Sequence, residues 1–181
     1  MANLAAALDA MVFELGTTNV SVTVTDEAAN DAVCTFNVVV SDDENPEITG
    51  CPTADIALGT NSDGKGNDNC TTSFAVAASL VAPTITAADN CTEAGALTFS
   101  LSATNSATVG TSSGTIAGLD LALNDLTFEL GTTIVTVIVT DETGNTDECD
   151  FNVVVSDDEV PIFTDCPAAD IELGTNADGG D

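Results

Sequence analysis

The stretch Gly131–Val155, GTTIVTVIVTDETGNTDECDFNVVV, decides the fold of this chain. Val135, Val137 and Val139 alternate along it with a period of two, which is the pattern of a strand with one buried face. A turn rich in Asp, Glu, Gly and Asn follows, and a second apolar run covers Phe151–Val155. Two such runs around a short polar turn predict a β-hairpin.

The same stretch occurs a second time, 115 residues earlier, as GTTNVSVTVTDEAANDAVCTFNVVV at residues 16–40. When residues 1–66 are placed over residues 116–181, 40 of the 66 positions are identical. Self-similarity at a fixed offset is the signature of tandem repeats. The chain is therefore predicted to be part of an array with a 115-residue period.

The remaining segments read mostly as short strands. Residues 71–78 and 96–103 are apolar enough for strands, and only residues 119–126 show helical periodicity. Many short strands separated by Gly, Asn, Asp and Pro turns favour an all-β fold with an antiparallel β-sandwich in each repeat.

The composition excludes most functional classes. The 181 residues contain 30 Asp and Glu but a single basic residue, Lys65, and the net charge is −29. Without His or Arg there is no imidazole catalysis and no guanidinium clamp for phosphate. The acids lie in turns and linkers, so we predict no enzyme. Nucleic acids and anionic membranes are bound through Lys and Arg, so neither is an expected partner, and no run is apolar enough for membrane insertion.

At this point the residues resemble a known family. Four motifs follow one another: G-T-T-x-V-x-V-x-V-T-D-x-x-x-N, C-x-F-x-V-x-V, D-D-E-x-P and C-P-x-A-D-I. Together with Asp89-Asn90-Cys91, these motifs are similar to the hyalin repeat (HYR), an immunoglobulin-like extracellular module. The resemblance implies adhesion or extracellular assembly without catalysis. Its strand order divides the chain into the closing strands of one repeat (1–45), a complete domain (46–160) and the opening strand and loop of a third (161–181).

The cysteines favour disulfides and an oxidising, extracellular location, because six of them occur without His and without a C-x-x-C pair. The central domain holds four cysteines, which allow three pairings. The topology that the resemblance implies pairs Cys91 with Cys149 and Cys51 with Cys70. Cys34 and Cys166 are then expected to find partners outside this chain. Buried free thiols are the alternative.

Three acidic clusters are candidate calcium sites, because crowded carboxylates repel one another and Ca²⁺ takes about 6 to 8 oxygen ligands. The linkers after the two hairpins resemble the calcium-binding cadherin linker, and they supply Asp42, Asp43, Glu44, Asp157, Asp158 and Glu159. A Gly-rich loop supplies Asn61, Asp63, Asn67 and Asp68. The turns expected at the pole facing the first linker supply Asp89, Asn90, Asp141, Glu142 and Asn145. The alternative for each cluster is a set of ordinary solvated turn residues.

These observations predict a structural repeat segment of an extracellular or cell-surface fibre or adhesin, stiffened by Ca²⁺ at its linkers and by disulfides. Its partners would be neighbouring repeats or identical subunits. One alternative is an adhesion module for a protein or glycan, although the lack of Trp and Tyr counts against sugar stacking. Another is a subunit that polymerises by strand donation, since a partial sandwich leaves an unpaired sheet edge.

Overall fold

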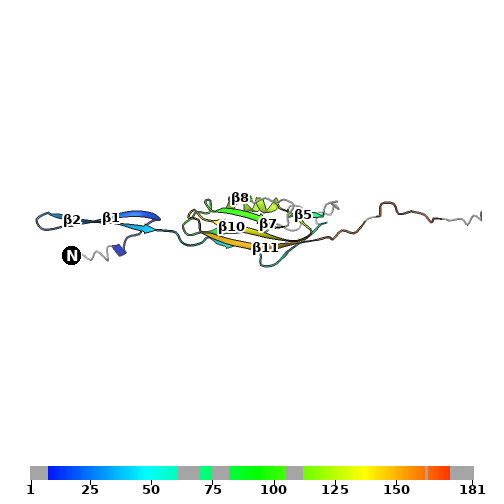
Figure 1. The fold of residues 1–181 in the computed structure, drawn as a ribbon, viewed down its shortest axis with the longest axis horizontal. Helices are drawn as coiled ribbons and strands as arrows, with labels where there is room; N and C mark the ends of the chain where they lie inside the picture. Colours follow the sequence, from blue (N-terminus) through cyan, green and yellow to red (C-terminus); the bar gives the residue numbers. More distant parts are fainter. Residues whose placement is uncertain (1–7, 61–69, 75–81, 105–111, 162, 172–181) are drawn as a thin grey trace, which may run out of the picture.

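The computed structural model describes residues 8–60, 70–74, 82–104, 112–161 and 163–171. The described part is built mainly of β-strands (Figure 1). The strands are β1 (Gly16–Thr25), β2 (Asp31–Val40), β3 (Glu47–Thr49), β4 (Ile56–Gly59), β5 (Thr71–Ser73), β6 (Thr86–Ala88), β7 (Thr98–Ala103), β8 (Ser112–Thr115), β9 (Thr127–Glu129), β10 (Gly131–Thr140) and β11 (Thr146–Ser156). A 3₁₀ turn at Ile116–Gly118 leads into helix α2 (Leu119–Asn124).

Both predicted hairpins are present and have the same register. In β10–β11, Val135 lies opposite Phe151 and Val137 opposite Cys149. In β1–β2, the residues 115 positions earlier pair in the same way, with Val22 opposite Cys34. The period-two alternation of the sequence thus places equivalent side chains on equivalent faces of the two hairpins.

Residues 46–160 contain a sandwich core, which we call the central sandwich. Its main sheet has the order β4-β11-β10-β7-β8, and the small sheets β3-β6 and β5-β9 lie beside it. The predicted all-β architecture is confirmed, with one detail that the sequence did not indicate: β4 pairs with β11 in parallel, whereas the other pairings are antiparallel.

The core of the central sandwich comes from the inward face of the main sheet and from α2. Val135, Val137 and Val139 are fully buried, as are Leu119 and Leu123 of the helix. The helix forms within the segment that showed helical periodicity, because its leucines four residues apart face the same way. In the same core, the Phe74 and Phe128 rings meet edge to face with centroids 5.1 Å apart, a favourable aromatic geometry.

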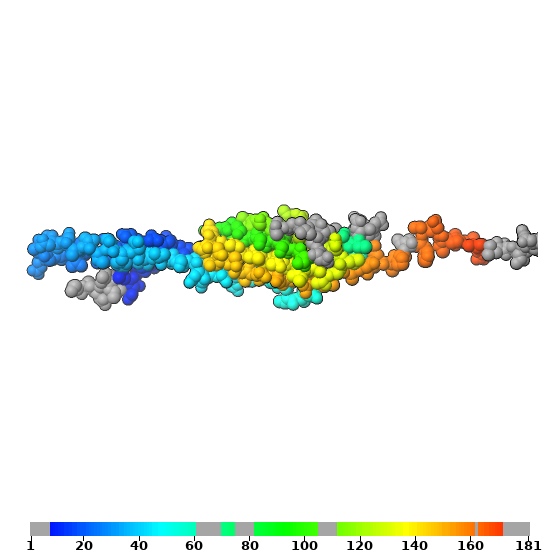
Figure 2. All heavy atoms as spheres, viewed as in Figure 1, coloured from blue at the N-terminus to red at the C-terminus, as the bar shows by residue number. Residues whose placement is uncertain are grey.

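The molecule is elongated. The β1–β2 hairpin lies at one end and joins the central sandwich through the linker 41–46, and residues 157–171 leave the opposite end as an extended chain (Figure 1, Figure 2). Among the described residues, no helix is long and apolar enough to cross a bilayer.

Candidate cation site at the first linker

The site begins with a turn that Asp141 organises between β10 and β11. Its Oδ1 accepts hydrogen bonds from the backbone N–H groups of Thr143, Gly144 and Asn145 at 2.9, 2.6 and 2.8 Å, and Oδ2 accepts one from Asn145 Nδ2 at 2.8 Å. Such a carboxylate-capped turn lets the chain reverse without unsatisfied backbone donors. Asp141 is buried, with 6% of its surface exposed.

These hydrogen bonds favour the ionised form of Asp141. Desolvation by its surroundings acts to raise the pKa of this carboxyl group, but the bonds from Asn145, Gly144 and Thr143 outweigh it and hold the pKa below its ordinary value. The negative charge is therefore maintained in a buried position.

A second carboxylate comes from the turn that precedes β7. Asp89 Oδ1 accepts hydrogen bonds from the N–H groups of Cys91 and Thr92 at 2.8 and 2.6 Å. Thr92 is buried and its Oγ1 in turn accepts a bond from the Glu142 N–H at 3.3 Å, which ties this turn to the β10–β11 turn. Thr92 could not be recognised as a site residue from the sequence, because a Thr in a turn carries no distinctive signal.

The third carboxylate comes from the linker after β2. Asp42 Oδ1 accepts a bond from the Glu44 N–H at 3.3 Å, and the Asp42 backbone carbonyl accepts one from Asn145 Nδ2 at 3.4 Å. Beside it, Asn90 Nδ2 donates to Glu44 Oε2. The linker is therefore held against both turns of the central sandwich by polar contacts.

The three turns bring Asp42, Asp89 and Asp141 together, so that one carboxylate oxygen of each lies within 4.8 Å of the others. Two of these groups have an oxygen that is shielded from solvent and lacks a hydrogen-bond partner: Asp42 Oδ2 and Asp89 Oδ2. No basic residue occurs among the described residues, since Lys65 is the single cation of the chain and lies outside them. Unpaired, buried carboxylate oxygens are costly, and a hard cation would satisfy them.

The negative field also acts on the Cys91 thiol. Desolvation raises its pKa, and the charges of Asp42, Asp89, Glu44 and Asp141 raise it further by disfavouring a thiolate. The second of these causes is the same crowding of like charges that the three carboxylates show.

The other sequence candidates lie elsewhere. Asp43 and Glu142 are exposed residues of the same linker and turn, outside the group of three. Asp157, Asp158 and Glu159 follow β11, where Asp157 and Asp158 each accept a long 3.4 Å bond from Thr60 Oγ1. Asn61, Asp63, Asn67 and Asp68 lie outside the described residues.

The second linker repeats the local geometry of the first. Asp157 Oδ1 accepts a bond from the Glu159 N–H at 3.1 Å, as Asp42 does from Glu44. Counterparts of Asp89 and Asp141 at the same 115-residue offset would fall beyond residue 181. Within the described part of the chain, three carboxylates converge in this way at the first linker.

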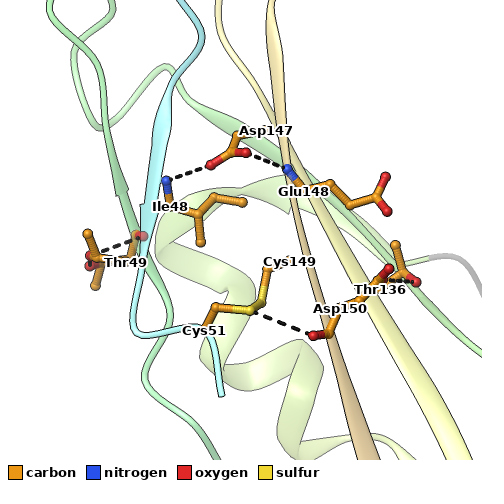
Figure 3. Close-up of a disulfide and its surroundings, with 9 residues drawn as sticks. Ile48, Thr49, Cys51, Thr136, Asp147, Glu148, Cys149 and Asp150 are labelled. Atoms are coloured by element: carbon orange, nitrogen blue, oxygen red, sulfur yellow. Dashed lines mark hydrogen bonds between the residues drawn. A yellow bond between two sulfur atoms is a disulfide. The ribbon is translucent and has the colours of Figure 1, made fainter. Parts of the chain in front are cut away.

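Both predicted disulfides are wrong: the structure joins Cys51 to Cys149, with Cα atoms 5.8 Å apart. Cys149 does not lie at the pole beside Cys91; it is the fourth residue of β11 and its side chain points into the core. β3 lies beside the start of β11, where Asp147 Oδ2 accepts a 3.0 Å bond from the Ile48 N–H, and the chain that follows β3 brings Cys51 to Cys149 (Figure 3).

Cys70 and Cys91 are exposed free thiols near opposite ends of the central sandwich. Cys70 precedes β5, and β5 pairs with β9, the strand just before β10, so Cys70 lies near the start of β10. Cys91 lies near the turn that follows β10, at the other end of the strand. The ten residues of β10 span about 33 Å, too far for a bond.

Comparison with known proteins places part of the chain in a family. Residues 80–155 match the family model described as the HYR domain. No curated protein matches the sequence. Among solved structures, one described as "Protocadherin gammaB7 EC3-6 cis-dimer structure" is similar at 15% identity and a TM-score of 0.33, covering 78% of this chain; the chain spans 33% of that structure's length. Over residues 80–155 this chain is therefore similar to the HYR domain, the hyalin repeat that its sequence resembles.

Proposed function

We propose that this chain is a structural repeat segment of an extracellular or cell-surface fibre or adhesin, in which Ca²⁺ stiffens the junction between repeats. The HYR match supports an extracellular, adhesion-type repeat without enzymatic activity. In this proposal residues 46–160 are one complete unit, residues 1–45 close the preceding unit and residues 161–181 open the next. Neighbouring repeats or identical subunits are the partners.

The observation that carries the calcium proposal is the convergence of Asp42, Asp89 and Asp141 with two shielded oxygens that have no hydrogen-bond partner. Oxygen ligands alone, with carboxylates predominating, are the chemistry that Ca²⁺ prefers; Mg²⁺ usually keeps several waters and takes one or two carboxylates. The three carboxylates would hold the ion, and nearby carbonyl oxygens and water would complete its shell.

The proposed mechanism follows from where the ligands come from. Asp42 belongs to the linker that leads from the preceding unit, whereas Asp89 and Asp141 belong to two turns of the central sandwich. An ion shared by the three fixes the direction in which the linker enters the sandwich. An ion that binds only the ordered junction stabilises it in proportion to the logarithm of its concentration relative to Kd.

The test compares two equivalent aspartates. Asp42→Asn and Asp157→Asn alter the same linker motif and the same local turn. Among the described residues, Asp42 is the one of the two that belongs to a group of three converging carboxylates. We expect Asp42→Asn to weaken calcium binding at least about tenfold in isothermal calorimetry, a loss of about 1.4 kcal/mol, and Asp157→Asn to leave this site unchanged. Small-angle scattering of the parent chain should show a broader distribution of interatomic distances in EDTA than in calcium.

Two results would overturn the proposal. Scattering and melting that do not respond to calcium or EDTA would remove the role of the ion. Equal effects of the two substitutions would show that a general acidic surface, and not the first junction, attracts it.

A further inference from the structure

The first linker is anchored by packing where it enters the central sandwich. Pro46 is fully buried there, whereas Glu44 and Asn45 before it are exposed. A hollow of about 360 Å³ lies between these two exposed residues and the turn that contains Asp89. Because side chains do not fill this hollow, the direction of the linker before Pro46 depends on polar contacts with the sandwich.

Two asparagines of the central sandwich make such contacts. Asn145 Nδ2 donates to the Asp42 backbone carbonyl at 3.4 Å, and Asn90 Nδ2 donates to Glu44 Oε2. Asn145 is the last residue of the turn between β10 and β11, and Asn90 lies in the turn that follows β6. Their side chains therefore hold the linker from two different turns.

The Asn145 side chain must present its nitrogen to the linker. Its Nδ2 lies 2.8 Å from Asp141 Oδ2, 2.8 Å from Thr143 Oγ1 and 3.4 Å from the Asp42 carbonyl oxygen. A carboxylate oxygen and a carbonyl oxygen are acceptors only, so a group between them has to be a donor. An amide oxygen in that position would be repelled by both. The atom of Asn145 that faces the linker is thus a hydrogen-bond donor, which cannot be a cation ligand.

Both sides of the junction carry negative charge, which limits the ways in which the linker can be held. Asp42 and Glu44 belong to the linker, and Asp89 and Asp141 belong to the sandwich. No Lys or Arg among the described residues can pair with them. Amide groups donate hydrogen bonds without adding charge, and a bond to an ionised acceptor such as Glu44 is stronger than one between neutral groups. Two asparagine amides are therefore suited to hold an acidic linker to an acidic surface.

The repeat provides a matched turn for comparison. Asn30, 115 residues before Asn145, donates its backbone N–H to Asp26 Oδ1 at 2.8 Å and its Nδ2 to Asp26 Oδ2 at 2.9 Å. Asn145 makes the same two bonds to Asp141 and, in addition, the bond to Asp42. Asn30 is exposed, and its bonds among the described residues stay within its own hairpin. The turn thus forms without a linker beside it, and holding the linker is an additional role of Asn145.

We propose that Asn90 and Asn145 are positioning residues that clamp the first linker against the central sandwich. The clamp holds Asp42 beside the other two carboxylates of the group. On sequence alone both asparagines are candidate ligands, but in this role they act through the linker and do not touch the ion. The effect on calcium rests on the proposed calcium function, whereas the clamp itself consists of protein groups and needs no ion.

The link between clamp and ion is a population argument. An ion that needs all three carboxylates binds only the docked linker, so its apparent Kd equals the intrinsic Kd divided by the docked fraction. Loosening the clamp therefore raises the apparent Kd and leaves the set of ligand atoms unchanged. Removing a ligand also raises the Kd, but it opens a position on the ion that water can take.

The first test measures the clamp in EDTA. Small-angle scattering and NMR relaxation of the linker amides compare the parent chain, a double variant that combines Asn90→Ala with Asn145→Ala, and the control Asn30→Ala. We expect the double variant to show a broader distribution of interatomic distances and faster linker motion than the parent. Asn30→Ala removes the equivalent side-chain bond of the other turn and should match the parent at the linker.

The second test separates positioning from ligation. Asn90→Ala alone should raise the calcium Kd about two- to tenfold in isothermal calorimetry, the factor for one hydrogen bond, and Asn30→Ala should leave it unchanged. Luminescence lifetimes in H₂O and D₂O then count the waters on bound Eu³⁺, a hard cation that takes oxygen ligands as Ca²⁺ does. We expect the same number of waters for the parent, Asn90→Ala and Asn145→Ala. Asp42→Ala removes a ligand and should gain at least one water.

Each role has a result that excludes it. An additional water on the ion in Asn90→Ala or Asn145→Ala would make that asparagine a ligand and end its positioning role. Equal scattering and linker motion of the parent and the double variant in EDTA would show that there is no clamp. A parent chain that binds no calcium would remove the proposed calcium function, while the comparison in EDTA would still decide whether the clamp exists.

Discussion

Replacing Asp89 by Asn should cost more stability in the presence of calcium than in its absence. Asp42 and Asp89 carboxylate oxygens lie within 4.8 Å of each other, with no basic residue among the described residues. At that distance two unit charges repel by about 1 kcal/mol in bulk water and by about 3.5 kcal/mol at an effective dielectric constant of 20. The amide keeps an acceptor for the Cys91 and Thr92 N–H groups but loses the charge that strengthens those two bonds, which costs about 1 kcal/mol.

Without calcium the balance therefore lies between about zero and 2.5 kcal/mol in favour of the variant. With calcium the variant lacks one charged ligand, and a Kd that rises tenfold to a hundredfold removes about 1.4 to 2.7 kcal/mol of ion-linked stability. For a domain of this size about 1 kcal/mol corresponds to roughly 4 °C in Tm. Asp89→Asn should thus melt at or above the parent temperature in EDTA, and its Tm relative to the parent should be about 6 to 11 °C lower in saturating calcium than in EDTA.

The assay is thermal unfolding of the parent chain, Asp89→Asn and Glu93→Gln in both buffers. Glu93 is an exposed acid near the same turn, so its substitution removes a nearby charge without touching the group of three. A loss of stability for Asp89→Asn that is equal in the two buffers would refute the reasoning, because Asp89 would then act only as a turn residue.

Cys51→Ser should lower the unfolding free energy by about 2 to 4 kcal/mol in urea denaturation, and dithiothreitol should have no further effect on the variant. Gly50→Ala should destabilise the chain more than other surface substitutions, because Gly50 has φ +81° and an added Cβ would lie 2.2 Å from the Thr84 backbone oxygen. The fall in Tm can be measured by circular dichroism. Hydrogen bonds from the side chain and backbone of Asn30 hold the pKa of Asp26 below its ordinary value. The stabilisation of the hairpin by ionised Asp26 is therefore complete above the pKa of the unfolded state and is lost as the pH falls through the pKa of the folded state. An NMR titration of Asp26 should show a depressed midpoint, and an ordinary midpoint would contradict this prediction. Cys91 should react with iodoacetamide more slowly in the folded chain than in urea at the same pH, since its raised pKa reduces the thiolate; equal rates would contradict the crowding of charge around it.

The hairpins and the junction were predictable because their signals are local or repeated. Period-two valines select a strand, and the Asp-Glu turn closes it, so β10 and β11 follow from their own residues. That Asp89, Asp141 and Asp42 converge could be expected from the strand order of the family, which places both turns at the pole that faces the linker.

The disulfide and the parallel strand were not predictable in the same way. Which cysteine meets Cys149 depends on how the chain crosses after β3, and that crossing is set by the bond from the Ile48 N–H to Asp147, 99 residues away in sequence. Likewise, no local pattern distinguishes a parallel edge strand such as β4 from an antiparallel one. Contacts between residues so far apart depend on packing of the whole sandwich.

The position of the Cys51–Cys149 bond has a mechanical consequence. Tension applied along an array would enter the central sandwich near Pro46 and leave near Ser156, and the bond connects the chain close to these two points across a sequence separation of 98 residues. The load can therefore pass through the bond while the intervening polypeptide carries none of it. The bond would thus prevent about 330 Å of chain from extending when the unit unfolds under force, so each oxidised unit would be almost inextensible.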